Sequence, residues 1–145
     1  MKIKVVNFEI LSRHYKNYQD GVSRINDVKK GFVERLDPFK KQMEDLITKA
    51  NSGVEMTKEQ EVKFQELQNQ AIEIDEEYKF TMRKMNDELS KAIYSELSQF
   101  ISDWSDKNDI DMVIGSQEVV TLKPEHDVTQ QILEIIKENN LYVEM

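Results

Sequence analysis

The chain has 145 residues, of which 33% are charged and 39% hydrophobic, and its net charge is −8. This charge load is typical of long solvent-exposed helices, and four glycines and two prolines are too few for the turns of an all-β fold. The absence of cysteine excludes disulfides, thiolate metal ligands and cysteine nucleophiles. The acidic balance argues against nucleic acid as the main partner, because phosphate binding requires clustered Lys and Arg.

The N-terminal segment lacks the features of a leader or an anchor. It contains no apolar run of about 7–15 residues, which a signal peptide needs. No window approaches the roughly 20 apolar residues of a membrane span. We therefore expect a soluble chain without stable membrane insertion, either leaderless or already processed.

The first predicted element is a strand over residues 3–9, a short apolar segment that is rich in β-branched side chains. A short helix over residues 10–19 is expected to follow. It should stop at Asp20 and Gly21, which form a turn-type dipeptide.

Apolar residues then repeat at spacings of three and four along residues 22–50, which indicates a helix that packs along another helix. The members of this seam are Val22, Ile25, Val28, Phe32, Leu36, Phe39, Met43 and Leu46. Gly31 is a weak helix former, and Pro38 lacks a backbone donor. Together these two residues predict a kink within one helix, and a break into two helices is the alternative. Gly31 and Pro38 could also act as joints at which the helix bends.

The chain is expected to reverse at residues 51–60. Residues 51–53 can end the first long helix, and Thr57 with Gln60 forms a T-x-x-Q capping box for the next. That second helix should continue to about Asp106, since no Gly or Pro interrupts it, and its seam consists of Phe64, Leu67, Ala71, Ile74, Tyr78, Met82, Met85, Leu89, Ile93, Leu97, Phe100 and Trp104. The result is a long antiparallel hairpin, with the apolar C-terminal part of the second helix left to pack elsewhere.

Strand-like sequence returns at residues 111–122, where a tight turn around residues 115–117 is expected to separate two strands. Pro124 and an N-cap at Asp127 then predict a helix with Val128, Ile132, Leu133 and Ile136 directed inward. The closing residues 139–145 are either a fraying tail or one more edge strand. Two short strands do not form a stable sheet alone, so we expect the strand at residues 3–9 and other chains to complete it.

This order of elements resembles the Skp/OmpH family of periplasmic chaperones. The opening "KIKVVNFE" is similar to the first strand of that family, and "DIDMVIGSQEVV" followed by "DVTQQILEII" is similar to its closing block. The resemblance covers nearly the whole chain. It implies an α+β, mostly helical fold in which a long antiparallel hairpin projects as an arm from a small β body, three copies forming a "jellyfish".

The resemblance also implies a homotrimer that holds unfolded outer-membrane proteins between its arms without ATP. The body would be formed by residues 1–21 and about 90–145, and the arm by about 22–89. The body residues expected to join the trimer are Val5, Val6, Phe100, Trp104, Met112, Ile114, Val119 and Val120. The location implied is the periplasm, or the cytoplasm if Met1 is the native start.

The expected client contacts lie near the hairpin tip, where flexible and apolar side chains suit promiscuous binding. They are Phe32, Phe39, Met43, Leu46, Val54 and Met56. The alternative is that most of these residues fill the seam between the two helices. In that case Val54 and Met56, which lie in the turn, are the better candidates.

Other chemistry is not expected. The acidic cluster at residues 73–79 reads as a solvated helix face, and His14 and His126 have no partner at metal-ligand spacing. His126 could form a pH-sensitive pair with Asp127, or lie in a surface turn. No phosphate loop or nucleophile motif is present, so we expect no enzymatic activity and no cofactor. A trimeric intracellular or phage-encoded scaffold without clients, or a hexameric prefoldin-like assembly, are the alternatives.

Overall fold

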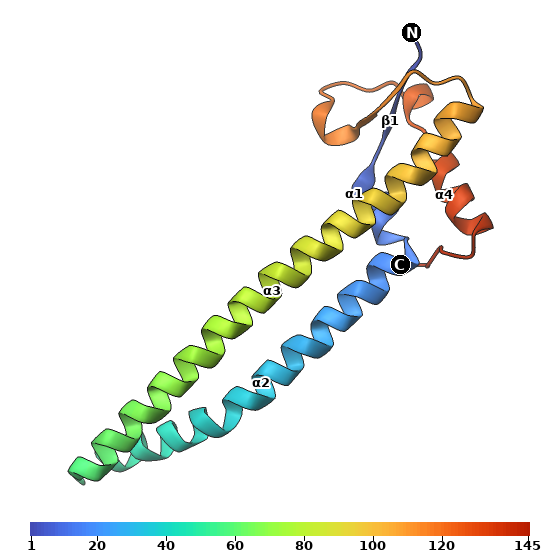
Figure 1. Cartoon of the computed structure of the whole chain (residues 1–145). Coiled ribbons are helices and arrows are strands. Elements are labelled where there is room, and N and C mark those ends of the chain that lie inside the picture. Colours follow the sequence, from blue (N-terminus) through green and yellow to red (C-terminus); the bar gives the residue numbers. More distant parts are fainter. The chain divides into compact units, whose positions relative to one another are not determined.

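The computed structural model describes residues 1–145 (Figure 1). The elements in chain order are β1 (Ile3–Val6), α1 (Phe8–Arg13), α2 (Lys16–Asn51), α3 (Lys58–Lys107), β2 (Met112–Gly115), two single 3₁₀ turns (Ser116–Glu118 and Pro124–His126) and α4 (Thr129–Glu138). The chain divides into two compact units. We call Met1–Ser23 with Asp87–Met145 the terminal unit, and Arg24–Asn86 the hairpin unit.

The terminal unit contains the only sheet, in which β1 and β2 pair in parallel. Ile3 lies opposite Met112, and Val6 lies opposite Gly115. Side chains alternate between the two faces of a strand, so Val6 and Val113 share one face while Val5 and Ile114 share the other. The Val6 face packs on the core, whose buried members are Val6, Leu11, Tyr15, Ile93, Leu97, Ile101, Ile132, Leu133 and Ile136.

The junction between β1 and α4 is fixed by a chain of hydrogen bonds. Val128 donates its N–H to the Val5 carbonyl (2.8 Å), and Asn7 donates its N–H to Thr129 Oγ1 (2.9 Å). The side chain of Asn7 in turn accepts from the Ile10 N–H and caps α1. The Asp-Val-Thr sequence at the start of α4 therefore ties the last helix to the first strand.

Asp127 is not the N-cap that the sequence predicted. Helix α4 begins at Thr129, and its N-cap position is Val128. The Asp127 carboxylate still satisfies the start of the helix, because its Oδ1 accepts from the Thr129 N–H (2.9 Å) and hydroxyl (2.6 Å). The nearest carboxylate to the His126 ring belongs to Glu125 (3.6 Å).

The predicted helix stop at Gly21 is wrong. The chain breaks at His14 and Tyr15, and Gly21 lies inside α2. A Cβ atom at Gly21 would clash with the side-chain end of Leu89 of α3, so that Leu89 would have to move to another rotamer. The glycine marks a close approach of two helices, which a sequence cannot distinguish from a turn.

The break between α1 and α2 is closed by the end of the chain. Lys16 donates its N–H to the Leu141 carbonyl (2.6 Å), and Val143 donates its N–H to the His14 carbonyl (2.8 Å). The Tyr142 ring stacks on the His14 ring (centroids 5.1 Å apart), with the Lys137 ammonium 4.6 Å from its centroid. The tail therefore matches neither predicted alternative: it is held at the junction by one isolated bridge between Tyr15 and Tyr142, and it adds no edge strand to the sheet.

The hairpin unit confirms the predicted reversal, with its α2 and α3 segments side by side and antiparallel (Figure 1). Gly53 adopts a left-handed φ of 88° after α2. Thr57 and Gln60 form the predicted capping box, with reciprocal bonds of 2.9 and 3.2 Å. Pro38 does not break the helix, since α2 continues through it to Asn51.

Only one of the two strands predicted for residues 111–122 forms. After β2, a 3₁₀ turn follows at Ser116–Glu118, and the next residues have no strand partner. Val120 is 99% exposed. A strand is stabilised by cross-strand packing and hydrogen bonds, and a single chain offers none at this position.

Candidate interaction surfaces

The predicted client contacts occupy different environments. Phe32 is buried, and its ring lies edge-on to Tyr78 of α3 (centroids 5.5 Å apart). Phe39, Met43 and Leu46 are half-buried along the seam. Val54, in the turn, is exposed, whereas Met56 is half-buried.

Several apolar side chains of the hairpin unit are exposed although they lie off the seam. They are Val33, Ile47, Val62, Ile72 and Phe80, together with Val54 in the turn. The helical members of this set do not belong to the repeat of three and four positions that predicts a seam, so the sequence did not single them out. Val33, Ile47 and Ile72 each directly follow a seam residue, whereas Val62 and Phe80 lie two positions from the nearest one. An apolar residue outside the seam of an amphipathic helix is the signal that could have identified them.

Polar contacts in the hairpin unit fix the relation of its helices. Arg35 donates two hydrogen bonds to the Glu77 carboxylate (3.3 and 3.1 Å), and its guanidinium lies 5.1 Å from the centre of the Phe32 ring. This is the one ion pair that joins two different helices. Bidentate geometry of this kind holds two side chains in register.

The terminal unit exposes apolar residues on the second face of its sheet. A hollow of about 670 Å³ lies over this face, lined by Met1, Ile3, Val5, Ile114, Val119, Thr121, Leu122, Lys123 and His126. Among the predicted trimer residues, Val5 and Val6 are buried within the chain, and Phe100, Trp104, Ile114 and Val119 are half-buried. Met112 and Val120 are exposed.

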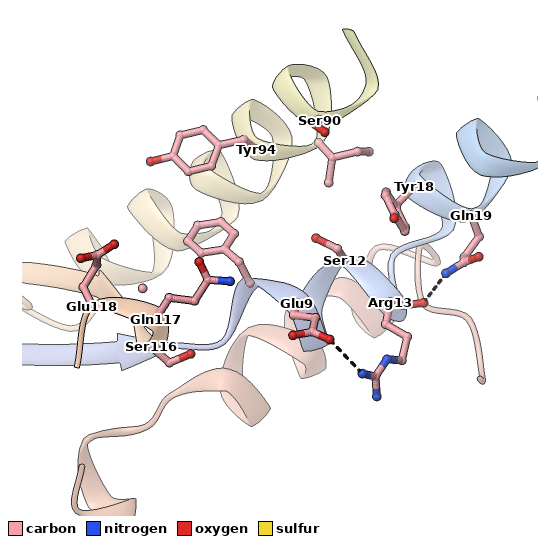
Figure 2. A pocket seen from close by; sticks show the side chains of 13 residues that line it. Glu9, Ser12, Arg13, Tyr18, Gln19, Ser90, Tyr94, Ser116, Gln117 and Glu118 are labelled. Atoms are coloured by element: carbon pink, nitrogen blue, oxygen red, sulfur yellow. Dashed lines mark hydrogen bonds and ion pairs between the residues drawn. The ribbon is translucent and has the colours of Figure 1, made fainter. Parts of the chain in front are cut away.

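A second hollow of the terminal unit, about 730 Å³, lies between α1, α3 and the turn after β2. Phe8 and Tyr94 stack there with ring centroids 5.3 Å apart. Figure 2 shows the polar rim, in which Arg13 pairs with Glu9 (3.6 Å) and Gln19 donates to the Arg13 carbonyl (2.9 Å). These polar groups on the rim pair with one another, which leaves the Phe8 and Tyr94 rings as the main feature of the hollow. The hollow is therefore an aromatic groove on the surface.

One titratable group of the terminal unit is strongly perturbed. Burial, together with the nearby Glu96 carboxylate, raises the pKa of Tyr15 to about 12. The Tyr15 hydroxyl donates to Glu96 Oε1 (3.2 Å), and Asn17 donates to the same oxygen (2.8 Å). Because the ring sits in the hydrophobic core, this network is structural.

No group of three or more His, Asp and Glu side chains is arranged to hold a metal ion. No helix combines the length and apolar character needed to cross a membrane.

Comparisons with known proteins agree with this geometry. The family model described as outer membrane protein (OmpH-like) matches residues 2–136. No curated protein matches the chain. A crystal structure of a proposed OmpH-like outer membrane chaperone from Caulobacter crescentus CB15 superposes with a TM-score of 0.66 at 11% identity, covering 99% of this chain and 88% of that one. The likeness in structure confirms the predicted fold of long helices with a small β region.

Proposed function

Because the chain belongs to the OmpH-like family, we propose that it is a holdase chaperone that binds unfolded proteins of the outer-membrane type without ATP. The observation that carries this proposal is the family match over residues 2–136, which include the first strand and most of the last helix. The exposed apolar side chains of the hairpin unit support it, since each of them is 45–63% exposed to solvent. A chaperone of this kind needs no catalytic group and no cofactor.

We propose further that three chains assemble through their terminal units. The apolar sheet face and the strand-like segment around Val120 support this, because both lack partners in one chain. A neighbouring chain could complete the sheet that β1 and β2 begin, as small sheets generally require. The family resemblance favours a homotrimer.

Clients would be held by the helical hairpins of the three copies, through many contacts that are individually weak. Val54 and the half-buried Met56 at the hairpin turn are the best placed of the contacts first predicted. Phe32, Phe39, Met43 and Leu46 would contribute only where the seam opens. The proposed location is the periplasm, which the match to an OmpH-like family supports.

Two measurements test the function together. Light scattering should give the mass of three chains, and the protein should suppress aggregation of a β-barrel protein diluted from urea, without ATP. A stable monomer would refute the trimer. An unchanged aggregation rate at a molar excess of trimer would refute the holdase activity.

A further inference from the structure

The aromatic groove of the terminal unit has no part in the holding of clients by the hairpins. It is the hollow of about 730 Å³ between α1, α3 and the turn after β2, and all of its lining residues belong to the terminal unit. Its size falls within the range of roughly 300–1,000 Å³ that is usual for ligand sites. The groove therefore has room for a large side chain of a bound partner.

The apolar part of the groove is a pair of aromatic rings. Phe8 and Tyr94 stack with their ring centroids 5.3 Å apart and their planes at 23°. Phe8 packs against the core, whereas Tyr94 is 64% exposed. The face of an aromatic ring carries partial negative charge and attracts cations. An exposed ring at the mouth of a groove is thus a surface on which a cation can bind.

Three charged side chains line the groove, and only one of them is unpaired. Glu9 and Arg13 pair with each other (3.6 Å), and they lie at the other end of the groove from Glu118 (Figure 2). Glu118 is exposed and takes part in no ion pair of the chain. The end of the groove formed by the turn after β2 therefore carries one free carboxylate.

Basic residues next to the groove do not offset this carboxylate. Lys16 on α2 and Lys91 on α3 are each paired with an aspartate one helical turn away. Lys4 of β1 donates to the Glu125 carbonyl, and neither of these two residues lines the groove. The terminal unit as a whole is also acidic. The charge of the groove thus favours a cationic ligand.

A carboxylate and an aromatic ring in one groove suit a guanidinium group better than an ammonium group. The planar guanidinium stacks on aromatic rings and donates two parallel hydrogen bonds to a carboxylate. A lysine ammonium is a more strongly hydrated point charge. Ser12, Ser90 and Gln117 form no hydrogen bond to the other lining residues (Figure 2), so they can accept the remaining guanidinium donors.

We propose that the aromatic groove binds an arginine side chain in an extended segment of an unfolded client. This inference rests on the proposed holdase function, and it adds a site in the terminal unit to the contacts of the hairpins. An unfolded segment displays all its side chains, so an arginine can enter the groove without its neighbours. The rival occupant is a second copy of the chain, whose acidic terminal unit is the poorer electrostatic match.

The test uses the full-length protein and three labelled peptides of Gly, Ser and Leu. The peptides are identical except at two positions, which hold arginine, lysine or citrulline, the neutral isostere of arginine. Binding is measured by fluorescence anisotropy. We expect the arginine peptide to bind about fivefold or more tighter than the citrulline peptide, which corresponds to roughly 1 kcal/mol, and the lysine peptide to lie between them.

Two variants remove the two halves of the site, and a third is the control. Glu118→Gln removes the free carboxylate, and Tyr94→Leu removes the exposed ring but keeps an apolar side chain. Each should remove most of the difference between the arginine and citrulline peptides. Glu138→Gln removes the same charge from an exposed residue of the terminal unit that does not line the groove. This control should change the affinity for the arginine peptide less than twofold.

The possible outcomes separate the site from the function. Equal binding of the arginine and citrulline peptides, or an equal loss in Glu138→Gln, would overturn the arginine site. A changed oligomer mass in Glu118→Gln and Tyr94→Leu alone would assign the groove to a second copy instead. If the unaltered protein binds the arginine peptide through Glu118 but does not suppress aggregation of a β-barrel protein, the holdase function is refuted and the site stands.

Discussion

At Gly21, the Leu89 side chain of α3 occupies the space that a Cβ atom on α2 would need. Gly31 is an internal control in the same helix, because a Cβ atom there would meet nothing within 4 Å. The two glycines thus share a helical backbone and differ only in their neighbours.

We therefore predict opposite signs for the same substitution at these two sites. Gly31→Ala should raise the free energy of unfolding by up to about 1 kcal/mol through helix propensity. Gly21→Ala should lower it by about 1–2 kcal/mol, because overpacking exceeds that gain. Urea denaturation followed by circular dichroism measures both, and adding Leu89→Ala should relieve part of the Gly21→Ala loss. A stabilised Gly21→Ala variant would contradict the close approach.

Tyr15 predicts a pH dependence of stability. The pKa of its hydroxyl is about 12 in the folded chain, against an ordinary value of 10.0. Since the folded-state pKa is the higher one, the stabilisation is fully present below pH 10 and is lost as the pH rises towards 12. The loss should approach 2–3 kcal/mol, at about 1.4 kcal/mol for each pKa unit.

The matched variant is Tyr15→Phe, which keeps the aromatic ring and removes the hydroxyl group that titrates. Its free energy of unfolding should fall less steeply than that of the unaltered chain between pH 10 and 12. The near-ultraviolet absorbance of phenolate should also show a tyrosine that ionises only near pH 12, and this step should be missing in Tyr15→Phe. Parallel pH profiles for the two proteins would show that Tyr15 does not titrate abnormally.

Among the elements, the C-terminal tail acts as a cap for two helices. At their junction the Gln19 side chain donates to the carbonyl of Arg13, the last residue of α1 (2.9 Å). The tail supplies a carbonyl for the Lys16 N–H and an N–H for the His14 carbonyl. Asn140 turns the chain towards the junction with a φ of 58°. The tail lies beyond residue 136, where the family match ends.

Removal of residues 141–145 should therefore expose the junction. We predict loss of hydrogen-exchange protection at the Lys16 amide and a destabilisation of about 1–3 kcal/mol, because the tail hydrogen bonds and the packing of Leu141 and Tyr142 on the core are lost. Removal of the exposed Glu144 and Met145 alone is the control and should leave the Lys16 amide protected. An unchanged exchange rate in the longer truncation would mean that other groups cap α2.

How far the sequence could predict each element depends on where the stabilising contacts lie. The hairpin and its capping box were predictable because spacing and capping are local, as Thr57 and Gln60 illustrate. The role of Gly21 was not, since it depends on Leu89, far away in the sequence. Val120 was predicted to lie in a strand and does not, because no other strand of the chain pairs with its segment. A sequence does not show which strand, if any, will pair with a given segment. The exposed Ile72 was overlooked because seam patterns reward only buried positions.

Across the whole molecule, charge is divided unequally. The terminal unit carries 8 Lys and Arg against 15 Asp and Glu, whereas the hairpin unit carries 12 against 13. The acidity of the chain thus belongs almost entirely to the terminal unit, and the proposed client-holding unit is nearly neutral. Self-association through terminal units would bring like charges together, so salt should strengthen the trimer by screening them.

The trimer proposal makes its sharpest prediction at Val120, the most exposed of the apolar residues expected at the interface. If a neighbouring chain covers this side chain, Val120→Asp places an unpaired carboxylate in an apolar contact, which costs several kcal/mol. We expect the dissociation constant of the trimer to rise by about 100-fold or more, equivalent to roughly 2.7 kcal/mol.

Val62→Asp is the control for this prediction, because it adds the same charge at an exposed valine of the hairpin unit. Sedimentation over a range of protein concentrations should show monomers for Val120→Asp under conditions in which Val62→Asp remains trimeric. Both variants should keep the helical circular dichroism of the unaltered chain, since neither valine packs against the core. If Val120→Asp leaves the trimer intact, the segment after β2 does not join chains, and the sheet face around Ile3 and Ile114 becomes the surface to alter next.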